Sequence, residues 1–256
     1  MTALSVEQWH ARFREQATWT HDLRGYIWER LGLYNSANET FLLEVGCGTG
    51  AVLTDLPQTP NSRILGVDIN LEYISLGKQL LPQAVFVGGN GMALPLPSKR
   101  FDVAFCHYFL LWLPEPLLVL REMRRVVKDG GVILALAEPD YGGRIDYPPA
   151  LEILGKLQQE ALIQQGANPF SGRSLAYLFT QAGLSNVETG ILGANWRIAS
   201  SLDQFQTEWQ VLRDDLANRV NEQELEKLFL ADQAARQAGV RILYVPTFYA
   251  MGFVTG

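Results

Sequence analysis

The chain has 256 residues, of which 48% are hydrophobic, so it can bury a sizeable core as one elaborated domain or two small ones. Its net charge of −6 argues against a general surface for nucleic acid or anionic membrane, which needs clustered Lys and Arg. Only Cys47 and Cys106 are present, which excludes a disulfide framework and a zinc site built from cysteines. With no apolar stretch of signal-peptide or membrane-spanning length, we expect a soluble cytoplasmic protein.

Residues 5–32 are predicted to be helical, with apolar and small polar side chains at helical spacing: Trp9, Phe13, Gln16, Thr20 and Leu23. The simplest interpretation is an amphipathic helix that packs its apolar face on a sheet. The alternative is a cover over a ligand site. Trp19 is then the best candidate for a ligand contact, because its broad ring can shield a reactive group from water.

Residues 41–45 form a short apolar run that predicts a buried strand. Gly46, Gly48 and Gly50 follow it on alternating positions, and a helix is expected to begin at Ala51 and to be cut short by Pro57. Such a strand, turn and helix typically cradle a cofactor, because glycine allows positive φ and a helix N-terminus offers free N–H groups. The spacing differs from the dinucleotide fingerprint G-x-G-x-x-G, and no Gly-Lys-Ser/Thr of a P-loop follows.

The pattern E-x-G-x-G-x-G closely resembles the first motif of the class I S-adenosylmethionine-dependent methyltransferases, of the small-molecule type known as methyltransferase type 11. The resemblance implies that Glu44 positions the methionine end of the cofactor. It also implies that Gly46, Cys47, Gly48 and Gly50 lie along the cofactor. A glycine-rich turn without a ligand is the alternative interpretation of this motif alone.

Residues 63–68 are predicted to form the second strand, which ends in Asp68, about twenty residues beyond the glycine turn. At this position a carboxylate can accept hydrogen bonds from the two ribose hydroxyls. The alternative role for Asp68 is that of N-cap for a helix over 70–81. The resemblance further implies that Ile69 lies beside the adenine.

Residues 84–87 are predicted to form the third strand, and Asn90 stands shortly after it, where the family usually has an Asp that receives the adenine amine. The amide oxygen of Asn90 can accept the same hydrogen bond without the charge. Gly91 and Met92 are expected to complete the adenine site, with the Met92 thioether at the ring edge. The sequence Leu-Pro-Leu-Pro over 94–97 supports this alignment.

Residues 101–106 are predicted to form the fourth strand. In the resembled family, the residues just past this strand line the sulfonium and the acceptor. His107 and Tyr108 should therefore border the methyl group. His107 is a candidate general base because histidine titrates near neutrality; the alternative is a histidine that only shapes the pocket. The Asp/Asn-Pro-Pro-Tyr motif of methyltransferases acting on base or glutamine nitrogens is absent from 107–110, and the similar residues 147–149 follow the fifth strand instead.

The rest of the chain continues the alternation of helices and strands and then departs from it. We expect helices over 115–128, 149–165 and 174–183, and strands over 132–137 and 185–192. About forty-five residues then intervene, far more than a usual connection, with helices near 202–218 and 222–237. Residues 241–245 and 248–254 should supply the closing strand, with a bulge at Pro246.

The resulting prediction is a doubly wound, Rossmann-like α/β fold with a seven-stranded sheet and an antiparallel last strand. Residues 1–256 form a single methyltransferase domain, with helical additions over 1–33 and 195–239. The insertion 195–239 is predicted to be a substrate lid above the strand ends, on account of its apolar residues: Trp196, Phe205, Trp209, Leu212, Leu225, Leu228 and Phe229. Its apolar underside should face Trp112, Tyr141 and Tyr147. A dimerisation surface is the alternative.

The implied reaction is methyl transfer from S-adenosylmethionine to a small, apolar or aromatic acceptor, with no metal and with neither nucleic acid nor membrane as partner. Two other classes remain open. A non-catalytic S-adenosylmethionine-binding protein could keep the same cradle, and an NAD-dependent dehydrogenase shares the sheet and the ribose acid but needs the other glycine spacing. The sequence leaves the oligomeric state and the methylated atom open.

Overall fold

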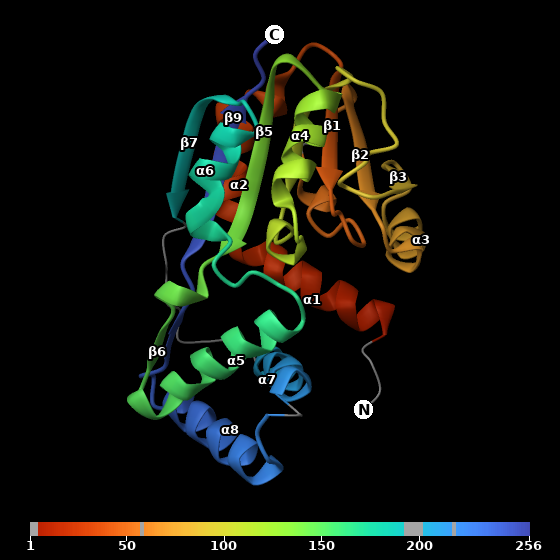
Figure 1. The fold of residues 1–256 in the computed structure, drawn as a ribbon. Helices are drawn as coiled ribbons and strands as arrows, with labels where there is room; N and C mark the ends of the chain where they lie inside the picture. The colour runs from red at the N-terminus through yellow and green to blue at the C-terminus, as the bar shows by residue number, and fades with distance from the viewer. Residues whose placement is uncertain (1–4, 57–58, 192–201, 217–218) are drawn as a thin grey trace.

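A computed structural model describes residues 5–56, 59–191, 202–216 and 219–256. Its centre is a seven-stranded sheet of order β3-β2-β1-β4-β5-β9-β7, in which β9 runs antiparallel to both β5 and β7 (Figure 1). The predicted seven-stranded, doubly wound sheet with an antiparallel last strand is therefore confirmed. The strands are β1 (Thr40–Val45), β2 (Ser62–Asp68), β3 (Val85–Gly88), β4 (Phe101–Cys106), β5 (Val127–Pro139), β7 (Ser185–Ile191) and β9 (Thr247–Phe253).

Helices cover both faces of the sheet because its central strands are apolar on both sides. Along β1, Leu42 packs with one buried cluster and Leu43 with the other, as the two-residue period of a strand requires. Helices α4 (Pro116–Val126) and α6 (Leu175–Gln181) cover the face of Leu43. Helices α2 (His21–Arg30) and α3 (Leu71–Leu80) cover the opposite face.

The N-terminal segment forms two helices, where the sequence predicted one over 5–32. Helix α1 (Val6–Trp19) begins with a capping box in which Ser5 and Gln8 satisfy each other's backbone N–H. It ends at Thr20, whose φ of −113° and ψ of 9° leave the helical region. The break lets α2 pack on the sheet while α1 crosses below the strand ends (Figure 1).

Two further predictions of local structure were wrong. No α-helix follows the glycine turn among the described residues 51–56; a single 3₁₀ turn, Leu53–Asp55, stands there instead. Residues 241–245 do not extend the closing strand, since β8 (Ile242–Tyr244) pairs with β6 (Ile145–Tyr147) in a separate two-stranded sheet. Pro246 separates β8 from β9, and it cannot donate the backbone hydrogen bond that would continue the ladder.

The insertion packs as part of a second hydrophobic core below the sheet (Figure 1). Helices α7 (Leu202–Leu216) and α8 (Glu222–Gln237) join α5 (Glu152–Gln164) around Trp209, whose side chain is 1% exposed. The indole Nε1 of Trp209 donates to Asp232 at 2.7 Å. Four of the apolar residues predicted to form the lid are buried in this core: Phe205, Trp209, Leu225 and Leu228. Trp196 lies outside the described residues.

Over the part of the chain that the structure describes, no helix combines the length and apolar character needed to cross a membrane.

Two leucines on α8 provide a test of the second core. Leu228 is 6% exposed and Leu230 is 52% exposed. We expect Leu228→Ala to lower the free energy of unfolding by about 2–5 kcal/mol, because the truncation leaves a cavity. Leu230→Ala, the matched control, should change it by less than about 0.5 kcal/mol. Urea denaturation of both variants measures the difference, and equal losses would contradict the packing of α8 described here.

Candidate functional site

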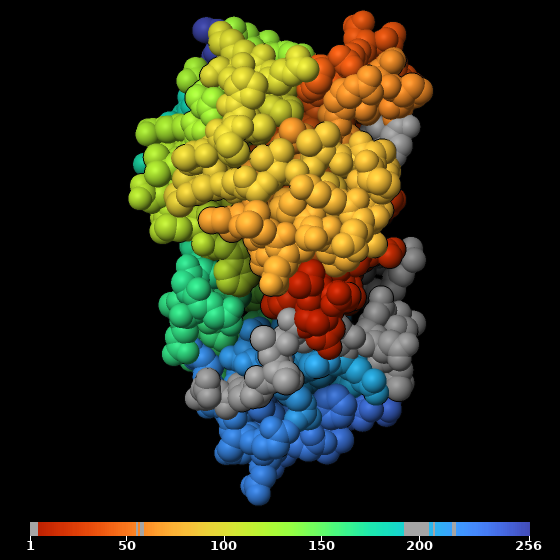
Figure 2. All heavy atoms as spheres, turned by 90° about the vertical axis from the view of Figure 1, so that its right-hand side faces the viewer, coloured from red at the N-terminus to blue at the C-terminus, as the bar shows by residue number. Residues whose placement is uncertain are grey.

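The carboxyl ends of the central parallel strands open into one cavity of about 810 Å³, the place where ligands bind in doubly wound sheets. Helix α1 crosses this edge of the sheet, and α5 and α7 enclose the cavity from below (Figure 1). In Figure 2 the N-terminal residues, in red, lie at the surface between the sheet region and the C-terminal helices. The structure brings eight of the predicted site residues to the cavity wall: Trp19, Glu44, Gly46, Cys47, Gly48, Asp68, His107 and Tyr108.

The glycine turn is backbone that only glycine accommodates. Gly46 has a φ of 75° and Gly48 a φ of 51°, both in the left-handed region. A Cβ atom on Gly46 would collide with the ring of Phe109, and one on Gly48 would come within 3.1 Å of the ring of Phe13. The turn is therefore a cradle that side chains cannot fill, with an aromatic ring on either side.

Asp68 ties the glycine turn to the start of α3. Its Oδ2 accepts a hydrogen bond from the Gly48 N–H at 2.7 Å, and its Oδ1 accepts one from the Asn70 N–H at 2.8 Å. The N-cap of α3 is Asn70, whose side chain accepts from the N–H groups of Glu72 and Tyr73. Asp68 is thus not the helix cap, and each of its oxygens keeps a lone pair for a further donor on the cavity side.

Five of the predicted contacts lie outside the wall of this cavity: Gly50, Ile69, Asn90, Gly91 and Met92. Ile69, which follows Asp68 in the chain, is 73% exposed. The Oδ1 of Asn90 accepts the backbone N–H of Met92 at 2.9 Å, so this oxygen already closes a local turn. The roles of these residues toward adenine stay predictions.

Glu44 is a buried acid within electrostatic range of a buried cation. Burial raises the pKa of Glu44 well above its ordinary value, while the charge of Arg24 acts in the opposite direction. Arg24 reaches the site from α2 and is 1% exposed. The Oε2 of Glu44 has no hydrogen-bond partner among the described residues, although Glu44 is only 2% exposed. A cationic ligand group in the cavity would satisfy this oxygen.

His107 belongs to the same buried chain of polar groups. Its Nε2 lies 2.7 Å from the hydroxyl of Thr20, which also accepts a hydrogen bond from Arg24. Burial and the charge of Arg24 lower the pKa of His107 to about 3, so the ring is neutral at physiological pH. A base this weak is a poor proton acceptor, and the contacts favour a positioning role for the residue.

Tyr108 is held in an unusual conformation by a buried carboxylate. Its φ of 48° lies in the left-handed region, which is uncommon for a residue with a side chain. The following three N–H groups, of Phe109, Leu110 and Leu111, donate to the carboxylate of Glu138 at 3.0, 2.8 and 3.0 Å. Sequence reasoning missed Glu138, although an acid at the end of an apolar strand was a signal.

Helix α1 closes over the glycine turn from the solvent side. Phe13 stacks with Trp9 at 5.7 Å and meets Tyr73 edge-on at 5.4 Å between ring centroids. The Nδ1 of His10 lies 2.8 Å from the Thr49 hydroxyl. Phe13, Trp9 and Tyr73 line the cavity as well. The sequence showed the helical spacing of this segment but not which of its rings would face the turn.

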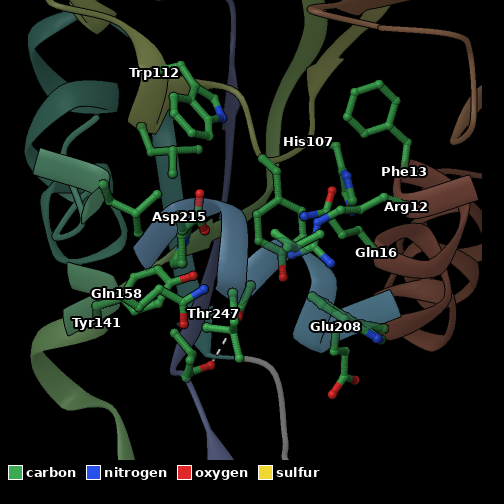
Figure 3. A pocket seen from close by; sticks show the side chains of 18 of the residues that line it. Arg12, Phe13, Gln16, His107, Trp112, Tyr141, Gln158, Glu208, Asp215 and Thr247 are labelled. Carbon is green, nitrogen blue, oxygen red and sulfur yellow. Dashed lines mark hydrogen bonds between the residues drawn. The ribbon is translucent and has the colours of Figure 1, made fainter. Parts of the chain in front are cut away.

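Beyond Tyr108 the cavity continues between the sheet and the second core, where its wall is mixed. Figure 3 shows Trp112 and Tyr141 on one side of this wall. The apolar and aromatic side chains that line it are Leu111, Trp112, Tyr141, Leu154, Leu162, Val211 and Leu212. Polar side chains reach the same space from α1, α5 and α7: Arg12, Gln16, Gln158, Gln165, Glu208 and Asp215.

Comparisons with known proteins agree with this geometry. A family described as "Methyltransferase domain" matches residues 43–135. A demethylmenaquinone methyltransferase of Lysinibacillus sphaericus is 33% identical over 163 residues, which cover 57% of this chain and 70% of the relative. A demethylmenaquinone methyltransferase of Bacillus subtilis is 33% identical over 166 residues, covering 57% of this chain and 71% of the relative.

Solved structures share the fold at low sequence identity. One, described as a methyltransferase from an antibiotic biosynthesis pathway of Anabaena variabilis, superposes with a TM-score of 0.61 at 16% identity and covers 87% of this chain and 94% of its own. A phosphoethanolamine N-methyltransferase of Haemonchus contortus, in complex with S-adenosylhomocysteine, gives a TM-score of 0.55 at 11% identity. The superposition covers 89% of this chain and 52% of that structure's chain.

The titration of Glu138 offers a test of the site's scaffold. Burial raises the pKa of Glu138 to about 7, against the opposing effect of its hydrogen bonds to 109–111 and Ser171. Between about pH 4.5 and 7 the folded chain therefore binds the proton more tightly than the unfolded chain. The contribution of Glu138 to stability is fully present below pH 4.5 and lost as pH rises to 7, by about 3 kcal/mol.

We expect this pH-dependent loss to disappear in Glu138→Gln, which has no titrating group. The variant should be less stable than the original chain at pH 5, since its amide N–H₂ opposes backbone donors, and the gap should narrow toward pH 8. Urea denaturation between pH 5 and pH 8 measures the difference in the free energy of unfolding between the variant and the original chain. Exposed Glu152→Gln is the control. A gap that widens with pH would mean that Glu138 stays ionised in the folded chain.

Proposed function

Because the chain belongs to the class I S-adenosylmethionine-dependent methyltransferases, and is thus an enzyme with S-adenosylmethionine as its cofactor, we propose that it methylates a small, apolar or aromatic acceptor in this cavity. The observation that carries the proposal is the continuity of the cavity. It runs from the glycine turn past Tyr108 into the space lined by Leu111, Trp112 and Tyr141. Relatives named for the methylation of demethylmenaquinone support an acceptor of this class.

The residues around the glycine turn suit the cofactor in charge and shape. Glu44, with a buried oxygen open to a ligand, would receive the amino group of the methionine end. The backbone of Gly46, Cys47 and Gly48 would lie along the cofactor, since all three residues line the cavity. Asp68 would accept the ribose hydroxyls. Ile69, Asn90, Gly91 and Met92 would hold the adenine, and Gly50 would lie along the cofactor with the rest of the turn.

When bound, S-adenosylmethionine supplies a methyl group already activated by its sulfonium. The work left to this chain is to align the acceptor and exclude water, which can supply much of the rate enhancement. Trp19 and Tyr108, whose ring centroids lie 6.3 Å apart, would shield the transferred methyl. His107 would fix the floor of the site through Thr20 and would take up the acceptor proton only if its pKa rose in the complex.

The proposal treats residues 1–256 as one methyltransferase domain in which the insertion 195–239 encloses the acceptor. Val211, Leu212 and Asp215 of α7 line the cavity, while Phe205, Trp209, Leu225 and Leu228 are buried in the second core. The net charge of −6 favours a small molecule over nucleic acid as the acceptor.

We expect Asp68→Ala to weaken S-adenosylmethionine binding by more than tenfold, because each charge-assisted hydrogen bond to a ribose hydroxyl contributes about 1.5–3 kcal/mol. Isothermal titration calorimetry gives the dissociation constant, and thermal unfolding shows whether the variant is folded. Exposed Asp22→Ala is the control. Unchanged affinity in Asp68→Ala would remove the ribose role and leave Asp68 as a brace between the glycine turn and α3.

The acceptor class is tested by the formation of S-adenosylhomocysteine with model acceptors. Turnover should be at least tenfold faster with 1-naphthol or 2-naphthol than with glycine or ethanolamine. Leu212→Glu should raise the KM for the naphthol by about tenfold or more, since a charge would line the apolar wall, and leave the KM for S-adenosylmethionine unchanged. Exposed Leu230→Glu is the control. Faster turnover with the amines would contradict an apolar or aromatic acceptor.

A further inference from the structure

Arg12 places a positive charge in the acceptor part of the cavity. It lies on α1 one position before Phe13, and its side chain lines the cavity on the side of Gln16 and His107 (Figure 3). It makes no hydrogen bond or ion pair with any residue in the described ranges 5–56, 59–191, 202–216 and 219–256. A half-buried guanidinium without a partner is costly, because its donors lose water and gain nothing in return.

The other arginines of the cavity wall are all paired with acids. Arg144 binds Asp146 at 2.6 Å, Arg241 binds Asp232 at 2.5 Å, and Arg236 binds Glu208 at 2.7 Å. Their charges are neutralised within the protein, and they brace β6, β8 and the two insertion helices. Arg12 differs from them because it lines the cavity without an ion pair to any residue in the described part of the chain.

The groups around Arg12 belong to the acceptor side of the cavity. Burial raises the pKa values of Tyr108, Tyr141 and Asp215, and the charge of Arg12 opposes this effect on all three, which places it within electrostatic range of each. Tyr108 and Tyr141 therefore keep their hydroxyl protons. Asp215 accepts a hydrogen bond from Gln165 at 2.9 Å.

Two acids compete for the charge of Arg12 without contacting it. Asp215 already has Gln165 as its partner. Burial raises the pKa of Glu15, as does the charge of Glu208, and Arg12 acts in the opposite direction. None of these carboxylates lies within ion-pair distance of Arg12 in the described part of the chain. Their charges lower the cost of a cation in the cavity, although none of them pairs with Arg12 in the described ranges.

We propose that Arg12 is a subsite for an anionic oxygen group, a carboxylate in the simplest case, on the methyl acceptor, in the cavity that Tyr108 and Tyr141 also line. The proposal rests on the proposed function and narrows it to an aromatic or apolar acid. An Arg guanidinium suits a carboxylate because two parallel N–H donors match its two oxygens. The methionine carboxylate of the cofactor has the same chemistry, so the experiment must separate the two sources.

The test uses the full chain saturated with S-adenosylhomocysteine, which occupies the cofactor site with its own carboxylate. Calorimetry then gives the affinity for 2-naphthoate and for 2-naphthamide, which differ in charge and hardly in shape. We expect the original chain to bind the acid at least tenfold more tightly than the amide. Arg12→Met should lose this preference, Arg12→Lys should restore part of it, and exposed Arg14→Met should keep it.

Each outcome has a distinct meaning. Affinity for S-adenosylhomocysteine should change less than twofold in Arg12→Met; a tenfold loss there, with the preference for the acid intact, would assign Arg12 to the cofactor carboxylate. Equal binding of acid and amide by the original chain would overturn the anionic subsite and leave the aromatic acceptor in place. Binding of neither compound would overturn the aromatic acceptor class together with this subsite.

Discussion

The buried charge of Arg24 is the constraint on which the site depends. Its guanidinium donates to the carbonyl of Ala17 at 2.7 Å and to the Thr20 hydroxyl, and so fixes the break between α1 and α2. Through Thr20 it orients His107, and through its charge it favours the ionised form of Glu44. Removing one partner of such a buried set leaves an uncompensated charge, which is far more costly than the net contribution of the pair. The N-terminal helices are therefore part of the structure of the site, and α1 supplies part of the cavity wall.

The sheet and the glycine turn could be predicted because their signals are local. A buried strand such as 101–106 shows as an apolar run, and the turn shows as three alternating glycines that must adopt positive φ. A helix was predicted near 222–237, and α8 is observed over Glu222–Gln237, where Asn221 is the N-cap and acids occupy the first turn. In each case the residues that specify the element are its own or its immediate neighbours.

The errors fall where distant residues decide the local structure. The break at Thr20 serves a contact with His107, 87 residues away, and nothing in 5–32 indicates it. The strand at 242–244 leaves the main sheet because a partner, 145–147, lies elsewhere in the fold. Arg24 and Glu138 were missed for the same reason. The charge of Arg24 acts on Glu44 and Glu138 holds the turn at 109–111, so both roles depend on elements that meet only in the folded chain.

The wall proposed for the cofactor and the wall proposed for the acceptor differ in how the fold specifies them. Most of the wall proposed for the cofactor consists of residues at strand ends, positions that the order of strands determines. The wall proposed for the acceptor is assembled from α1, α5, α7 and the loops after β4 and β5. A substitution on α7 can therefore alter the acceptor wall while the glycine turn stays unchanged. Methyltransferases with one cofactor cradle can in this way serve different acceptors, because the elements that shape the acceptor wall are added to the sheet rather than built into it.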